Sequence, residues 1–385
     1  MHKTCLFPIG PQHPSLKEPL FLKLYVEGTT VKDAVFDLGY AHRGVEEKLE
    51  GKQVDTALHA VQRTCGICSQ CHTMAFLRTV EGFAGVEIPD RVALQRVIVA
   101  ELERIHSHML WAGVMMHELG LDTLFMYFMR EREKVLDVFD ELTGNRVHHS
   151  SDLIGTSKRT FSEENLEFVL TTIDSIKENL VRYRKTVNSH DVIRDRCIGK
   201  GVITKKDAQT FGLVGPVARA CNINNDVRVT SPYMGYKMLK LKSIMRKEGD
   251  AQARTLVRLD EVFASMDLLR QACNQIPRKS KVPKYPVKRI AQGYGAGASE
   301  APRGENFHFI KVVNGKTARV KLRTPTLANL VMFPEAVKGA DITDVPVIVM
   351  SLDPCISCME RVAVVKDGKT EIWTSHELFR GEKKC

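Results

Sequence analysis

The sequence lacks any apolar run long enough to cross a membrane. Its most apolar window, residues 106–130, is interrupted by Glu118 and Asp122 and falls short of the roughly 18 uncharged apolar residues that a span needs. A secretory signal is also missing, because MHKTCLFPIGPQHP reaches its prolines before an apolar core can form. We therefore expect a cytoplasmic chain that other subunits would have to hold at any membrane on which it works.

Internal repeats and low-complexity segments are absent too, so the sequence is that of an ordinary globular protein. Its 385 residues, 43% of them hydrophobic, are enough to bury a sizeable core. The net charge of +10 would suit nucleic acid, an anionic membrane or acidic partner proteins. The basic residues are scattered, however, apart from runs at 240–247 and 277–289 that are typical of solvated surface. We expect no nucleic-acid partner.

Helical patterns dominate the middle of the chain. Before them, residues 20–37 alternate apolar and polar side chains around EGTT, which predicts a β-hairpin. Pro89-Asp90 is a start signal for the first long helix. Amphipathic spacing predicts helices over residues 90–119, 123–144, 162–187 and 248–276. Such helices would form a central bundle.

Short β-like pieces return near the carboxy terminus. Residues 306–324 and 345–353 are read as strands, with Asn-Gly at 314–315 as a hairpin turn, and residues 360–373 repeat the pattern around Asp-Gly. The prediction is an α+β fold, mainly α, with a central bundle of long helices and small antiparallel β regions near both ends. We divide it into an amino-terminal β-hairpin region packed on the main domain (1–60), a helical core with the first CxxC (61–279), an α/β region (280–361) and a hairpin tail (362–385).

Ten cysteines in a cytosolic chain argue for metal or redox chemistry rather than for a disulfide framework. Cys65 and Cys68 form one CxxC pair, and Cys355 and Cys358 form a second pair near the other end of the chain. Four thiolates suit zinc, nickel or an iron–sulfur cluster. Structural zinc sites usually draw on pairs roughly 12–20 residues apart, so zinc is the weaker interpretation. A thioredoxin-like redox pair would leave the second CxxC unexplained.

Two further residues follow the first pair. Cys71 lies three positions beyond Cys68, and we interpret it as a packing thiol, the commoner role of an extra cysteine. His72 comes next, and we interpret it as a hydrogen-bonding group beside the ligands rather than as a ligand.

The residues around both pairs carry a family resemblance. RTCGICSQCH (63–72) matches RxCGxCxxxH, and DPCISCMER (353–361) matches DPCxxCxxR. Together they resemble the two signatures of the large subunit of [NiFe] hydrogenases. GPQHPSLKEP (10–19), HRGVEEKLEG (42–51) and RTPTLANL (323–330) resemble its membrane-associated, energy-converting, Ech-type (group 4) branch, which is related to the quinone-pocket subunit of respiratory complex I. Those complex I relatives lack the four metal cysteines, whereas this chain has them all.

The resemblance implies specific roles for the four cysteines. Cys65 and Cys355 would be terminal nickel ligands, while Cys68 and Cys358 would bridge nickel to an iron that carries carbonyl and cyanide ligands. Four thiolates leave nickel a free coordination position, at which H2 can be split heterolytically. Magnesium is a further cofactor that the resemblance allows. We expect no iron–sulfur cluster in this chain, since the large subunits that it resembles carry none of their own and no CxxC lies outside these two segments.

The same resemblance implies residues around the metals. GASEAPRG (297–304) is similar to the family's loop beside the active site, so Arg303 would reach over the metals and Pro302 would shape the pocket of the diatomic ligands. Asp353 would be the carboxylate that supports this arginine. For proton transfer near a terminal thiolate, Glu18 is the preferred first acceptor, and Glu46 would serve as a later relay or hold a structural charge.

The resemblance also implies partners. They are a hydrogenase small subunit with a [4Fe-4S] cluster, a ferredoxin-like electron carrier, integral membrane subunits that place the chain on the cytoplasmic face of the membrane, and maturation proteins that load the metals. Many soluble relatives end the second motif with a histidine, where this chain has Arg361. The residues after it are either a retained tail or a removable propeptide. The alternative function is a complex I-like quinone or electron-transfer subunit without hydrogenase activity; a zinc-stabilised binding protein is a third interpretation.

Overall fold

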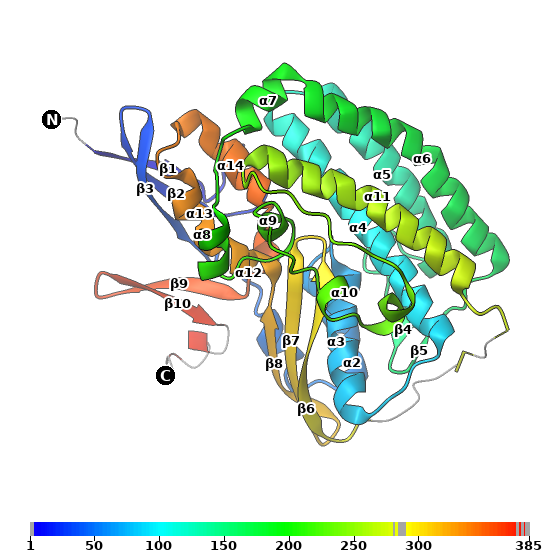
Figure 1. Ribbon diagram of the computed structural model, residues 1–385. Helices are drawn as coiled ribbons and strands as arrows, with labels where there is room; N and C mark the ends of the chain where they lie inside the picture. Colours follow the sequence, from blue (N-terminus) through cyan, green and yellow to red (C-terminus); the bar gives the residue numbers. More distant parts are fainter. Residues whose placement is uncertain (1–3, 280–281, 284–289, 375–376, 379–380, 382–385) are drawn as a thin grey trace.

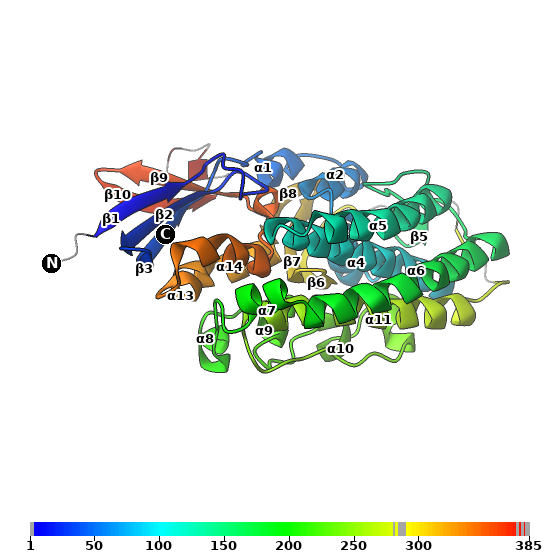
Figure 2. The same ribbon diagram turned by 90° about the horizontal axis from the view of Figure 1, so that it is seen from above.

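Four long helices form the body of the protein. The structure is a computed structural model that describes residues 4–279, 282–283, 290–374, 377–378 and 381. The long helices are α4 (Asp90–Glu118), α5 (Asp122–Thr143), α6 (Glu163–Ser189) and α11 (Ala251–Gln275). Helix α4 packs against α5 and α11, and α6 covers both α5 and α11 (Figures 1 and 2). The predicted central bundle is confirmed, in a mainly helical α+β fold.

Helices α4 and α11 are buried on nearly all sides, and they carry charges into the interior. Burying an unpaired charge is costly, so these side chains are paired. Arg104 of α4 lies 3.9 Å from the carboxylate of Glu261 on α11, and Glu261 lies 2.7 Å from Arg219 on α9 (Gly215–Arg219). Paired ions therefore join the centres of these helices to their neighbours.

Two three-stranded antiparallel sheets flank the bundle. The first consists of β1 (Cys5–Ile9), β2 (Phe21–Glu27) and β3 (Thr30–Asp37), in the order β1-β2-β3. Its β2–β3 pair closes at Glu27 and Thr30, which confirms the predicted amino-terminal hairpin. The second sheet consists of β6 (Gly293–Ala301), β7 (Gly304–Val313) and β8 (Lys316–Arg323), with α3 (Ser69–Ala84) packed on one face (Figure 1).

The region after Arg361 forms the expected hairpin, β9 (Arg361–Lys366) with β10 (Lys369–Thr374). The Ala363 N–H donates to the Leu38 carbonyl, which fastens this hairpin beside the amino-terminal sheet (Figure 2). Part of the predicted tail, including residues 382–385, lies outside the described residues. The domain boundaries given above stay predictions.

One predicted strand is wrong: residues 345–352 form helix α14 (Val345–Leu352). Pro346 stands in its first turn, where a proline fits a helix, and the apolar run packs against α4, α11 and α13. Short apolar runs of this kind are ambiguous between strand and helix. Helices α2 and α3 were not predicted. No described helix is both long and apolar enough to cross a membrane.

The remaining elements are short. They are α1 (Val45–Leu49), α2 (Val54–Val61), β4 (Asp152–Leu153), β5 (Thr156–Ser157), α7 (Asp191–Cys197), α8 (Lys205–Thr210), α9 (Gly215–Arg219), α10 (Val227–Thr230), α12 (Pro325–Asn329) and α13 (Phe333–Val337), with 3₁₀ turns at Gln62–Thr64, Met234–Met238, Leu330–Met332, Ile342–Asp344 and Ile356–Cys358.

Candidate metal centre

The first cysteine pair lies directly before helix α3. Cys65 follows the 3₁₀ turn Gln62–Thr64, and Cys68 caps α3 at its amino end. The free N–H groups of this helix end are met by the buried carboxylate of Glu103 on α4, which accepts from the backbone of Gln70 at 2.6 Å and of Cys71 at 3.0 Å. Helix α4 therefore holds the first cysteine segment in place through Glu103.

The second pair follows helix α14. Asp353 ends that helix in a left-handed conformation with φ of 57°, and Cys358 closes the 3₁₀ turn Ile356–Cys358. The Cys355 N–H donates to the Thr326 hydroxyl at 3.0 Å. The Ile356 and Ser357 N–H groups both donate to the carboxylate of Glu18, from the opposite end of the chain.

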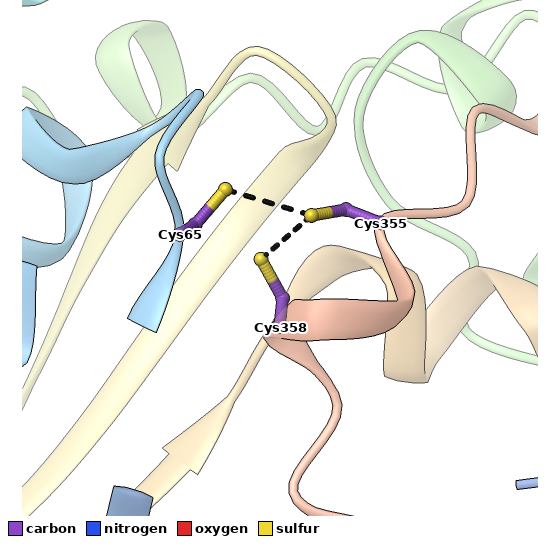
Figure 3. Close-up of side chains that lie close together, drawn as sticks. All are labelled: Cys65, Cys355 and Cys358. Carbon is purple, nitrogen blue, oxygen red and sulfur yellow. Dashed lines mark hydrogen bonds between the residues drawn. The ribbon is translucent and has the colours of Figure 1, made fainter. Parts of the chain in front are cut away.

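The four thiols meet inside the protein, where each is at most 4% exposed. The Cys355 Sγ lies 3.5 Å from that of Cys65 and 3.0 Å from that of Cys358 (Figure 3). Cys68, Cys358 and a nitrogen of His72 form a second group within 4.8 Å. Cys358 belongs to both groups and thus lies at the centre of the cluster.

The electrostatics of this cluster call for a cation. Hydrogen bonding with Cys358 and Cys65 lowers the pKa of the Cys68 thiol to about 6, whereas contact with the neighbouring thiols raises the pKa of Cys358 well above its usual value. Four crowded thiols cannot all ionise unless positive charge lies between them. Thiolates are ligands for soft and borderline metals, so this donor set fits nickel together with iron.

Arg303 lies at the edge of the cluster. Its guanidinium contacts Asp353 through an Nη2–Oδ1 pair of 2.8 Å and donates from Nη1 to the Ser107 hydroxyl at 3.3 Å. Burial opposes the charged form, but the Asp353 carboxylate and the cysteine thiols hold the pKa of Arg303 well above its usual value. A permanent positive charge therefore faces the thiols. Arg258 lies on the other side of Asp353, at 3.6 Å.

The turn between β6 and β7 sets the position of Arg303. Pro302 and Arg303 form this turn between the paired residues Ala301 and Gly304, and both are buried. The turn presses on Gly215 at the start of α9, where a Cβ would lie only 2.2 Å from the Arg303 carbonyl oxygen. Gly215 also has φ of +65°, so glycine is required at this close approach.

Glu18 lies beside the second cysteine pair. Burial and the nearby Cys355 raise the pKa of Glu18, although hydrogen bonds from Ser357 and Ile356 oppose that shift. The carboxylate also borders a mainly apolar cavity of about 270 Å³, which Arg303, Asp353 and Cys355 line as well. Glu18 thus lies between the thiol cluster and this cavity.

Glu46 has a different environment. Its carboxylate pairs with Lys321 at 2.9 Å and with Arg361 at 3.4 Å, and it accepts the Leu322 N–H at 2.9 Å. The Glu46 carboxylate thus has three donors around it, and the residue is only 2% exposed.

Two protein-family models match the sequence. One is described as "Nickel-dependent hydrogenase" and matches residues 43–122, which include the first cysteine pair. The other is described as "Respiratory-chain NADH dehydrogenase, 49 Kd subunit" and matches residues 118–292 and 287–361. The two matches together extend from the first cysteine pair through the second.

Curated relatives decide the family. The chain is 35% identical to the membrane-bound hydrogenase subunit alpha of Pyrococcus furiosus, over 97% of this chain and 91% of that one. It is 33% identical to the carbon monoxide-induced hydrogenase of Rhodospirillum rubrum, over 93% and 99% of the two chains. The chain belongs to the large subunits of group 4 membrane-bound [NiFe] hydrogenases.

This hydrogenase family is related to the 49 kDa subunit of complex I. An NADH-quinone oxidoreductase subunit of Clostridium beijerinckii is 30% identical to the chain, over 91% of this chain and 96% of that one. A chain of the membrane-bound sulfane sulfur reductase, an archaeal respiratory membrane complex, has the same fold with a TM-score of 0.86 and 28% identity, over 92% and 97% of the two chains. The hydrogenase-like fold is therefore confirmed.

Several side chains that support the site gave no signal in the sequence. Glu103, Ser107 and His308 contact the first cysteine segment, Arg303 and His72 respectively, but none of them stands in a motif at recognisable spacing. Thr326, which accepts from the Cys355 N–H, does lie in the segment RTPTLANL (323–330) that carries the family resemblance. The one available hint is that the α4 window carries charges at ELER among apolar residues. In a hydrogenase large subunit, charged residues among apolar ones in a buried helix indicate that side chains of opposite charge lie beside them in the core.

Proposed function

We propose that this chain is the catalytic subunit of a [NiFe] hydrogenase, which interconverts H2 with two protons and two electrons. The observation that carries the proposal is the meeting of four buried cysteines from two distant CxxC segments, in a chain of the hydrogenase family. The complex I branch has the same fold, so the complete set of thiols is what favours hydrogen chemistry here.

The residues of the chain would have the following roles. Cys65 and Cys355 would hold nickel, and Cys68 and Cys358 would hold both metals. When bound, this centre supplies the heterolytic cleavage of H2. Arg303, kept charged by Asp353, would stabilise negative charge on the diatomic ligands and the thiolates.

Glu18 would accept the proton. Its carboxylate is held beside Cys355 by the Ile356 and Ser357 N–H groups, and its raised pKa favours binding of a proton inside the protein. From Glu18 the proton would leave toward the cavity that this residue borders. We assign Glu46 a structural charge, because Lys321, Arg361 and the Leu322 N–H already occupy it.

The electrons would pass to a separate small subunit with a [4Fe-4S] cluster and then be exchanged with a ferredoxin-like carrier. Integral membrane subunits would hold the chain at the cytoplasmic face and couple the reaction to ion translocation. The relatives support such an assembly, since one is named a membrane-bound hydrogenase subunit and another belongs to a respiratory membrane complex.

Infrared spectroscopy combined with metal analysis of the purified complex tests this function. We expect carbonyl and cyanide stretching bands together with nickel and iron bound to the chain. Zinc as the only bound metal, or a complex without these bands, would overturn the proposal.

A second candidate function is a quinone-linked electron-transfer subunit without hydrogenase activity. The mainly apolar cavity beside Glu18 and the match to the 49 kDa family favour it. This function predicts a complex that reduces a quinone analogue, contains no nickel and neither makes nor consumes H2.

A further inference from the structure

Two histidines face each other behind the cysteine cluster. The Nδ1 of His72, in the first turn of α3, lies 3.1 Å from the Nε2 of His308 on β7, and neither side chain is more than 1% exposed. Asn306 stands two positions before His308 on the same inward face of β7. Its amide nitrogen lies 3.4 Å from the same Nδ1 of His72. Two side chains of one strand thus converge on one nitrogen.

The hydrogen bonds fix which nitrogen carries the proton. The Asn306 amide nitrogen also donates to the Cys71 carbonyl at 3.4 Å, and a carbonyl can only accept, so an N–H group faces His72. The Nδ1 of His72 must therefore present a lone pair, and the Nε2 of His308 must carry the hydrogen that it donates.

The opposite arrangement is unfavourable. If His72 donated from Nδ1, His308 would carry its hydrogen on its own Nδ1, which has no hydrogen-bond partner among the described residues. A buried N–H without an acceptor is rare in proteins.

The remaining hydrogen of His72 is consequently on Nε2. Since Nδ1 is engaged by β7, Nε2 is the nitrogen available to the thiols of Cys68 and Cys358, which lie with His72 in one group within 4.8 Å. An N–H cannot ligate a metal, but it can donate to a thiolate and withdraw electron density from it.

We propose that His308, assisted by Asn306, is a positioning residue that fixes the tautomer of His72, so that His72 directs an Nε2–H group toward the Cys68 and Cys358 thiolates. The inference rests on the proposed function, because these thiolates are the ones assigned to bridge the two metals. The role of His308 is to keep His72 from acting as a ligand and to limit the electron density that the bridging sulfurs give to iron.

Matched variants of His308 test this role in the purified complex. His308→Leu removes the N–H donor, so the carbonyl and cyanide bands should shift to lower wavenumber as the thiolates donate more density to iron. His308→Gln retains an N–H donor and should return the bands toward their wild-type positions. Ile310→Val, a buried change on the same face of β7, controls for packing and should leave the bands unchanged.

Several outcomes would overturn the inference. Wild-type band positions in His308→Leu would do so, and so would an equal shift in the Gln variant, which would indicate packing alone. If His308→Leu binds no nickel, Asn306→Ala decides, because loss of one of two donors should give a smaller shift in the same direction and an unchanged spectrum would refute the role. Absence of the bands from the wild-type complex would instead count against the proposed function itself.

Discussion

The two cysteine segments are held by different parts of the chain. The segment of Cys65 and Cys68 leads directly into helix α3, and its support comes from Glu103 on the neighbouring helix α4. The segment of Cys355 and Cys358 follows the short helix α14, and its N–H groups donate to Thr326 and to Glu18. The first segment thus belongs to the helical body, whereas the second is assembled from remote side chains.

The two segments should therefore respond differently to substitution. A change near the first segment should act through the stability of the helical body, because α3 and α4 are buried there. A change near the second should act on the chemistry, because Glu18 and Arg303 contact that segment and also face the cluster. Variants at each segment can therefore test this difference.

The largest effect should come from a ligand that belongs to both groups of thiols. Cys358→Ser should abolish nickel retention and with it H2 turnover, since a hydroxyl does not replace a bridging thiolate. Metal analysis of the purified chain measures this. Cys71→Ala is the matched control in the first segment, because Cys71 is equally buried but absent from both groups, and it should keep its nickel. Nickel loss in the control would contradict the assignment.

Next in size is the effect of Arg303→Lys. A lysine keeps the charge but cannot contact Asp353 and Ser107 at once, so we expect H2 turnover to fall by about 100-fold while nickel is retained. Turnover and metal content are measured on the same preparation. Full activity in this variant would show that charge alone is sufficient at this position.

Two carboxylates form the third test. Glu18→Gln cannot accept a proton, so turnover and H2–D2O exchange should drop by about 100-fold. Glu46→Gln removes a charge that Lys321 and Arg361 neutralise, so exchange should stay near wild type while the melting temperature falls. If the two variants lose exchange equally, the proposed separation of their roles is wrong.

The last test concerns stability rather than activity, and its dependence on pH, through Glu103. Burial raises the pKa of Glu103 to about 7 from 4.5, so the folded chain holds this proton more tightly than the unfolded chain does. Its stabilising contribution is complete below pH 4.5 and is lost as the pH rises through 7, by up to about 3 kcal/mol. Glu103→Gln should therefore lower the melting temperature less at pH 8 than at pH 5.

A neighbour with the opposite shift provides the control. Burial raises the pKa of Glu101, but Arg228 and Arg104 outweigh it, so the net pKa is lowered and Glu101 stays ionised from pH 5 to 8. The loss of melting temperature in Glu101→Gln should accordingly not shrink over this range. If the loss of melting temperature in Glu103→Gln were also constant from pH 5 to 8, Glu103 would not be the group that releases its proton over this range.

The sequence predicted the long helices and the hairpins well, and it failed where the local pattern was ambiguous. Residues 90–119 and 248–276 carry enough turns for their periodicity to be decisive, and they became α4 and α11. The run at 345–352 is short and rich in valine, so strand and helix fit it equally until packing against α4 and α11 decides.

The site was predictable only where residues stand in motifs. The four cysteines and Arg303 came from the family resemblance, and the structure brings the cysteines together beside Arg303 and Asp353. Glu103 and His308 were not predictable, because they act through contacts across the fold that leave no recognisable spacing in the sequence. The roles assigned to Pro302, His72, Glu18 and Glu46 stay predictions.

The wide separation of the two cysteine pairs also has a consequence in time. Cys65 is made well before its partners Cys355 and Cys358, since Cys355 lies 290 positions further along the chain. At typical translation rates the first pair waits roughly 15 to 60 s for the second. No metal can be enclosed by all four thiolates before Cys358 has been made, so loading follows the synthesis of the second pair, and until then the thiols of the first pair depend on the reducing state of the cell.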